Sequence, residues 1–227
     1  MKQWKILQRR TTQLPVLNPP TDRTYERKTV LVIGQGKGGT SVVCSVLDAL
    51  GVYVGSDEDI ASGGAFENHT LNKLMYEDPD AAEKEITRLC GVHSVWGHKL
   101  HHPAMPEQRM IDAMHSVYLV FVFRDILAPA LRYAEDDVNR FPDVVSALKH
   151  SRELSDLIYD LVTTTTYPSL LVSYDNIKSS PEIFVKCLSG FLRLTPTGEQ
   201  WAESVGRVQR SGGYLVIEEP GIWPVDD

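Results

Sequence analysis

The sequence has few cysteines and no long apolar run, and each absence excludes a class of protein. Only three cysteines occur in 227 residues, Cys44, Cys90 and Cys187. Their odd number and wide spacing indicate neither a disulfide framework nor a cysteine zinc site, so a reducing, cytoplasmic compartment is expected. No apolar run is long enough to span a bilayer, and no apolar signal-peptide core follows the basic N-terminus. We therefore expect no membrane span.

Positive charge is scarce as well. The formal net charge is -7, from 23 Lys and Arg against 30 Asp and Glu. Broad nucleic-acid binding needs a cationic surface that releases counterions from the phosphate backbone, so no nucleic-acid partner is expected. A local basic pocket remains compatible with this charge.

The composition and length predict one folded domain. Hydrophobic residues make up 42% and charged residues 23%, which is typical of globular proteins. Residues 1–27 mix charge with three prolines, which predicts an extended N-terminal arm. Residues 28–227 are then expected to form a single α/β domain, since this length suits one core.

Short apolar runs alternate with helical patterns along the chain. Strands are predicted over residues 29–34, 117–123 and 169–173, because unbroken β-branched runs are typical of strands buried on both faces. Helices are predicted over residues 40–50, 127–134, 143–162, 181–192 and 198–205. This alternation predicts a parallel sheet flanked by helices. Residues 56–114 show no strong strand pattern and are expected to cap the carboxyl edge of the sheet, where ligands bind.

A glycine-rich turn, Gly34-Gln-Gly-Lys-Gly-Gly-Thr-Ser41, lies between the first predicted strand and helix. Backbone N–H groups and the positive end of the helix converge there and attract phosphate. Glycines allow close approach of an anion, a lysine adds charge, and two hydroxyls can donate hydrogen bonds. The predicted nucleotide ligands are Gly36, Lys37, Gly38, Gly39, Thr40 and Ser41.

Other readings of this turn stay open. Gly34, Gly36 and Gly39 satisfy the G-x-G-x-x-G pattern of dinucleotide-binding folds, and Asp57 or Glu58 lies where a ribose-binding acid belongs. An NAD-dependent oxidoreductase is therefore an alternative. A Walker A ATPase is less favoured, because that loop needs a lysine at the place of Thr40. The glycines could also serve the geometry of the turn alone.

Several segments, in the same order, resemble those of sulfotransferases that use 3′-phosphoadenosine 5′-phosphosulfate (PAPS), in particular bacterial and phage-like members. The turn resembles the 5′-phosphosulfate loop of that family, with Gly38 in place of a serine. Further resemblances lie at residues 50–55, 63–68, 96–99, 120–125 and 170–177. The resemblance implies a three-layer, P-loop-like fold.

The resemblance also implies a reaction and roles for single residues. PAPS would be the co-substrate, and a sulfuryl group would pass to a hydroxyl or amine of a small molecule or glycan, without a metal. Lys37 would stabilise the leaving oxygen and Lys99 would lie near the sulfate. The remaining implied cofactor contacts are Arg124 at the 3′-phosphate, Arg132 at the place of a family serine, and Arg210 in a late basic loop.

Parts of this assignment have alternatives. Arg124 could instead pair with Asp125 or Asp175. The departures at Gly38 and Arg132 leave room for a homologue that binds nucleotide without catalysis.

A general base must accept the proton of the acceptor. Glu67 is the first candidate, because it lies in a segment that resembles the family's substrate loop, and His69 beside it could orient or replace it. Histidines also cluster at His93, His98, His101 and His102. No Asp or Cys accompanies them at ligand spacing, so no metal site is predicted, whereas His98 or His102 could act in catalysis.

Overall fold

A five-stranded sheet organises the structure, a computed structural model that describes residues 14–20, 26–55, 66–100 and 102–211. The strands are β1 (Val16–Leu17), β2 (Lys28–Gly34), β3 (Val95–Lys99), β4 (Ser116–Phe123) and β5 (Ser169–Ser173). Their order across the sheet is β1-β5-β4-β2-β3. β2 to β5 run parallel, and β1 pairs with β5 in the antiparallel direction.

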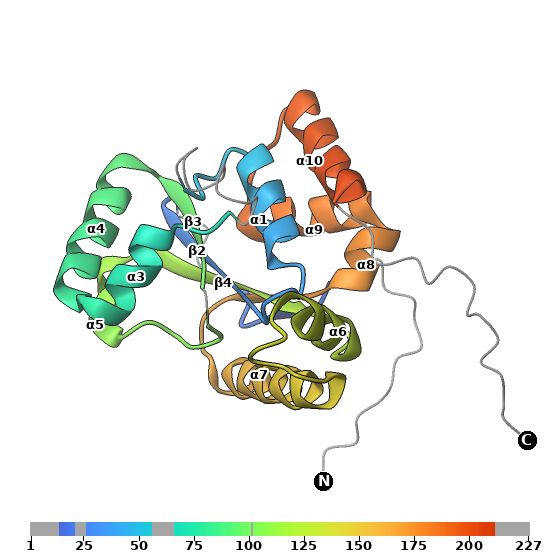
Figure 1. Cartoon of the computed structure of the whole chain (residues 1–227). Helices are drawn as coiled ribbons and strands as arrows, with labels where there is room; N and C mark the ends of the chain where they lie inside the picture. The colour runs from blue at the N-terminus through green and yellow to red at the C-terminus, as the bar shows by residue number, and fades with distance from the viewer. Residues whose placement is uncertain (1–13, 21–25, 56–65, 101, 212–227) are drawn as a thin grey trace, which may run out of the picture.

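Helices cover both faces of the sheet (Figure 1). They are α1 (Thr40–Ala49), α3 (His69–Glu77), α4 (Pro79–Val92), α5 (Gln108–Ala113), α6 (Leu127–Asp136), α7 (Val144–Thr164), α8 (Tyr174–Ser179), α9 (Pro181–Leu192) and α10 (Gly198–Arg210). This three-layer α/β architecture confirms the predicted fold class.

Alternating side chains of β2 enter two separate cores, because successive residues of a strand point to opposite faces. Val30 and Val32 pack with α1, α8, α9 and α10. Leu31 and Ile33 pack with α3, α4, α5 and α7. A smaller cluster joins α6 to α7. β4 likewise contributes side chains to both cores. Packing on both faces therefore holds the carboxyl ends of β2 and β4 in place.

All three predicted strands and all five predicted helices are present, but the chain contains strands that the apolar pattern missed. β3 lies within residues 56–114, where the sequence shows no strong strand pattern. It ends in Gly97, His98 and Lys99, so it lacks the apolar character of β2, and its pairing with β2 defines it. β1 lies within the predicted N-terminal arm and pairs with Ser169 and Leu170 of β5.

The strand order places the switch point of the sheet beside β2. The parallel strands, counted along the chain, are ordered 2-1-3-4 across the sheet, whereas dinucleotide-binding folds are ordered 3-2-1-4-5-6. In open α/β sheets, ligands bind at the carboxyl ends of the strands where the order reverses. Here that place is the end of β2 and β4, where the glycine-rich turn begins.

Within the parts of the chain that the structure describes, no helix combines the length and apolar character needed to cross a membrane.

Candidate functional site

The glycine-rich turn connects β2 to α1 and has the geometry of an anion site. Gly38 N donates to Gln35 O at 3.0 Å, which closes the turn. Gly39, the residue before α1, has a φ of 99° and no side chain that could cap the helix, whereas Asn68 caps α3 with its side chain. The first N–H groups of a helix need an acceptor from outside it. A phosphate at this place would supply one.

Two tyrosine side chains pack against the backbone of the turn. A Cβ atom on Gly39 would collide with the ring of Tyr174, and one on Gly36 would collide with the hydroxyl of Tyr133. Tyr174 follows directly after β5, and Tyr133 lies on α6. The turn therefore needs glycine at both positions because aromatic side chains lie against its backbone.

Arg124 lies at the end of β4 and contacts the turn. Its Nη1 donates to the main-chain oxygen of Lys37, and its guanidinium lies 4.7 Å from the centre of the Tyr174 ring. Burial lowers the pKa of Arg124 below its ordinary value, but an arginine remains charged at neutral pH. The structure thus brings Arg124 and the turn together, as predicted from the position of each after a buried strand.

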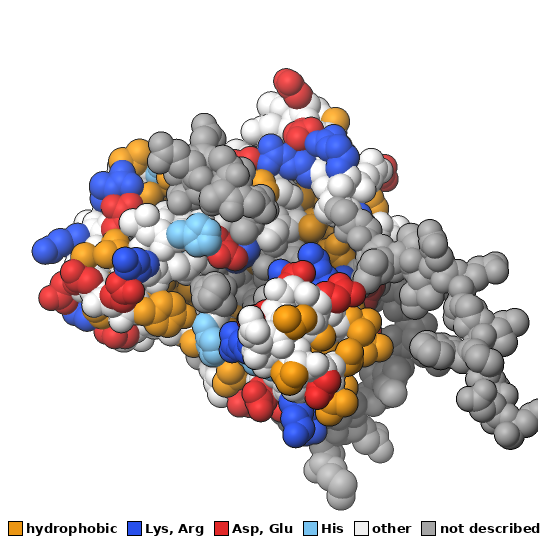
Figure 2. All heavy atoms as spheres, in the orientation of Figure 1, with side chains coloured by type: hydrophobic (Ala, Val, Ile, Leu, Met, Phe, Trp, Pro, Cys, Tyr) orange, Lys and Arg blue, Asp and Glu red, His pale blue; other side chains and the backbone are white. Residues whose placement is uncertain are grey.

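Lys37 is held in an unusual conformation. Its φ is 60°, a left-handed conformation that is uncommon outside glycine and is often found at functional sites. Its Nζ pairs with Asp136 Oδ2 at 2.5 Å. Figure 2 shows charged side chains of both signs between α1 and α6.

A second lysine reaches the turn from β3. Lys99 is only 6% exposed, and its Nζ lies 2.5 Å from Glu67 Oε1 and 3.2 Å from Ser41 Oγ. Glu67 Oε2 also lies 3.8 Å from His69 Nδ1. Three predicted site residues, Ser41, Glu67 and Lys99, therefore lie in contact although they come from distant parts of the chain.

His98 is buried beside this group. Its Nε2 lies 3.1 Å from Asn72 Oδ1; that oxygen only accepts, so Nε2 carries the proton. Its Nδ1 has no hydrogen-bond partner among the described residues. Burial lowers the pKa of His98 to about 4, so the ring is neutral at pH 7 and a weaker base than an ordinary histidine. This favours Glu67 over His98 as the proton acceptor.

The thiol of Cys44 is fully buried nearby, and burial raises its pKa to about 12. It remains protonated at neutral pH and therefore takes no nucleophilic role.

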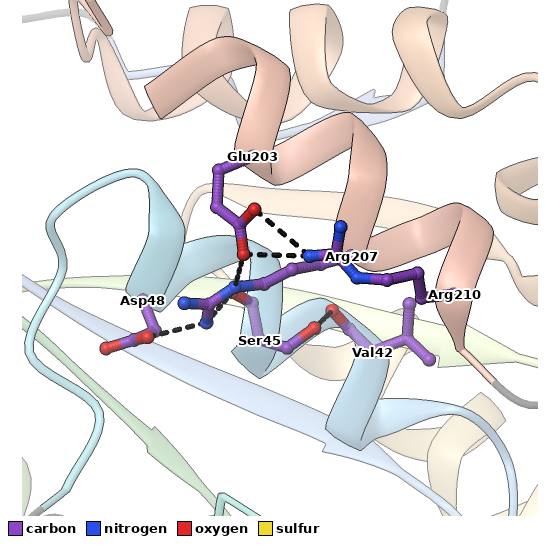
Figure 3. A network of polar contacts seen from close by, with 6 residues as sticks. All are labelled: Val42, Ser45, Asp48, Glu203, Arg207 and Arg210. Atoms are coloured by element: carbon purple, nitrogen blue, oxygen red, sulfur yellow. Dashed lines mark hydrogen bonds and ion pairs between the residues drawn. The ribbon is translucent and has the colours of Figure 1, made fainter. Parts of the chain in front are cut away.

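Arg210 is the last residue of α10. It donates to both carboxylate oxygens of Glu203, at 2.9 and 3.0 Å. Arg207 bonds Glu203, Asp48 and the main-chain oxygen of Ser45 (Figure 3). These bonds tie α10 to α1. The predicted contact between Arg210 and a nucleotide stays a prediction.

Other predicted residues divide between exposed positions and undescribed segments. Arg132 is exposed on α6, next to Tyr133. Thr40 is buried at the start of α1. The alternative ribose ligands Asp57 and Glu58, and also His101, lie outside the described residues. Among those that are described, no group of three or more His, Cys, Asp or Glu side chains could hold a metal ion.

Sequence reasoning missed Tyr133, Asp136 and Tyr174. Tyr174 follows β5 just as Arg124 follows β4, so the same argument from strand ends would have found it. Tyr133 and Asp136 contact the turn only because of how α6 packs, and the sequence carries no local signal for that.

Comparison with solved structures shows the fold. The sulfotransferase domain from the Synechococcus PCC 7002 olefin synthase is 13% identical, with 82% of this chain and 81% of that chain covered and a TM-score of 0.52. Retinol dehydratase in complex with androsterone and the inactive cofactor PAP is 12% identical, with 84% and 66% covered and a TM-score of 0.45. A sulfotransferase from Alicyclobacillus acidocaldarius is 11% identical, with 80% and 94% covered and a TM-score of 0.39.

No family model and no curated protein matches the sequence. The likeness to the olefin synthase domain confirms, for the fold, the resemblance noted in the sequence: the chain has a sulfotransferase-like fold. A shared fold does not by itself establish a shared activity.

Proposed function

We propose that this protein is a sulfotransferase that binds PAPS at residues 34–41 and passes its sulfuryl group to a hydroxyl or amine of a small molecule or glycan. One observation carries the proposal. Lys99 Nζ lies 3.2 Å from the Ser41 hydroxyl of the turn and 2.5 Å from Glu67. A cation and a carboxylate thus lie together beside the anion site, which sulfuryl transfer requires.

The donor would be held mainly by the turn. The N–H groups of Gly39 and Thr40 suit the 5′-phosphate, because they lie at the start of α1, whereas Gly38 N, also predicted as a ligand, is already bonded to Gln35 O. Arg124 is the candidate for the 3′-phosphate, since it lies after the neighbouring strand and presents several donors. Arg132, exposed on α6, is a second candidate for that phosphate.

In the transfer step, the acceptor oxygen or nitrogen forms a bond to sulfur while the bond from sulfur to the bridging oxygen of the donor breaks. Negative charge develops on that bridging oxygen, and Lys37 would stabilise it. The acceptor proton passes to Glu67, whose Oε1 lies 2.5 Å from Lys99 Nζ. Lys99, at the Ser41 hydroxyl, would also contact the sulfuryl oxygens. These roles need no metal.

The oxidoreductase alternative has less support. Its glycine pattern is present, but the strand order differs from that of dinucleotide-binding folds.

The proposed compartment is reducing and cytoplasmic, in keeping with Cys44 and Cys90, which are buried thiols.

Binding of adenosine 3′,5′-bisphosphate, measured by isothermal titration calorimetry, tests the donor site. Lys37→Met and Arg124→Gln should each weaken binding about tenfold or more, because each removes a charge-assisted hydrogen bond. The matched controls are Lys73→Met and Arg152→Gln, whose side chains are 70% and 77% exposed on α3 and α7. Preference for NAD over the bisphosphate would contradict the proposal.

A second experiment tests catalysis. The protein is incubated with sulfur-labelled PAPS and a panel of phenols, alcohols, amines and glycans, and transfer of label is followed. Glu67→Gln should abolish transfer while keeping bisphosphate affinity. If the wild-type protein binds the bisphosphate but transfers no label to any acceptor or to water, it is a nucleotide-binding homologue without catalysis.

A further inference from the structure

Asp136 contacts the turn, although the proposed chemistry does not use it. Its Oδ2 lies 2.5 Å from Lys37 Nζ, and the two side chains are 48% and 35% exposed. Asp136 is the last residue of α6, where the negative end of the helix disfavours a carboxylate. The pairing with Lys37 holds the pKa of Asp136 below its usual range. An acidic residue at this unfavourable place therefore stays ionised against the lysine of the turn.

The packing of α6 brings Asp136 to this place. Tyr133 and Asp136 are three residues apart and so share a face of the helix. The Tyr133 hydroxyl fills the space beside Gly36, while Asp136 reaches the next residue, Lys37. The Tyr133 ring is held in turn by Phe141 and His150, each with ring centres 5.3 Å away. This face of α6 is thus built against the turn.

Lys37 is held from its other side as well. Its main-chain oxygen accepts from Arg124, and its backbone has a left-handed conformation with a φ of 60°. The backbone of Lys37 is therefore fixed, and its ammonium group is the part that can exchange one anion for another.

We propose that Asp136 is the internal counter-ion of Lys37 and is displaced from it when the anionic group of the donor binds. This inference rests on the proposed function for the identity of that donor. Asp136 is a positioning residue, because it acts through Lys37. It holds the ammonium group beside the turn before the donor arrives, and an anion must outcompete it. A multiply charged phosphosulfate can do so. A weakly charged anion gains less binding free energy at the turn than is lost when the ion pair between Lys37 and Asp136 breaks.

A double-mutant cycle measured by calorimetry tests this inference. Asp136→Asn should bind adenosine 3′,5′-bisphosphate and inorganic pyrophosphate about two- to fivefold more tightly, since breaking a partly exposed ion pair costs that much affinity. In a Lys37→Met background, Asp136→Asn should change neither affinity. Asp136→Glu, which keeps the charge, should retain wild-type values. Glu135→Gln is the matched control, because it removes a charge from the preceding residue of α6, and it should leave affinity unchanged.

The outcomes separate this inference from the proposed function. If pyrophosphate shows the expected pattern but the bisphosphate does not bind, the counter-ion role holds and the PAPS donor is wrong. If the bisphosphate binds and Asp136→Asn weakens or does not change it, the counter-ion role is wrong and the donor site stands. Equal tightening in the Lys37→Met background shows only general repulsion and also overturns the inference, as does failure of both anions to bind.

Discussion

Replacing Gly38 with serine would add a Cβ atom against the backbone of the turn. That atom would lie 2.6 Å from the main-chain oxygen of Gln35 and 3.0 Å from its Cγ. The oxygen cannot move away cheaply, because it accepts the hydrogen bond from Gly38 N that closes the turn. Relief of such a clash by backbone shifts costs about 1–3 kcal/mol. We therefore expect the serine typical of the related loop to be harmful in this chain.

The assay combines urea denaturation with calorimetric binding of adenosine 3′,5′-bisphosphate. Gly38→Ser should lose about 1–3 kcal/mol of unfolding free energy and bind the bisphosphate more weakly, and Gly38→Ala should behave alike because the clash arises from Cβ. Gly91→Ser is the control, since a Cβ atom there meets nothing within 4 Å. A Gly38→Ser protein as stable as the wild type, with equal or tighter binding, would refute the reasoning.

Three further predictions concern residues around the turn. Lys99→Met should lower the unfolding free energy by about 3 kcal/mol, because it leaves the largely buried carboxylate of Glu67 without its cation, and Lys99→Met with Glu67→Gln should recover part of that loss in urea denaturation. The pKa of His98 is lowered to about 4 in the folded protein, so the unfolded state binds more protons below pH 6.5; stability should fall as pH drops from 6.5 to 4, by up to about 3 kcal/mol, and His98→Gln should flatten this dependence. Arg207→Gln should lower the melting temperature, because it loses bonds to α1, and it should leave bisphosphate affinity unchanged. A loss of bisphosphate affinity in Arg210→Gln would support the predicted contact between Arg210 and the nucleotide.

The sequence predicted the central strands and the turn because their signals are local. Residues 30–33 are all apolar, and the glycine-rich turn follows at once, so both the strand and the anion site can be predicted from one short segment. The contact of Arg124 with the turn was also predictable, since parallel strands bring their carboxyl ends to one edge.

β3 was not predictable in this way, because it is defined by its partner. Gly97, His98 and Lys99 look like a polar loop, and only the register with Val30, Leu31 and Val32 makes them a buried strand. The polar end of β3 is also the part that enters the site. The feature that hid the strand is thus the one that gives it a role.

Asp136 illustrates a second limit. It lies 99 positions after Lys37 in the chain, and no motif links the two. Their pairing depends on the way α6 packs through Tyr133, which is a property of the folded chain. Glu67 and Lys99 were each predicted separately, but their direct contact with each other was not.

The position of β3 in the sheet makes one part of the site freer to change in sequence than the other. We call the turn and Arg124 the donor end, and Lys99 with Glu67 the acceptor end. β2 and β4 carry the turn and Arg124, and each is hydrogen-bonded along both sides. β3 carries Lys99 and, among the residues that the structure describes, is bonded along its length only to β2, with one bridge from Trp96 to Tyr53. Slow amide exchange should therefore concentrate at the donor end. Over evolutionary time the acceptor end can diverge, while the donor end stays tied to the stability of the whole protein.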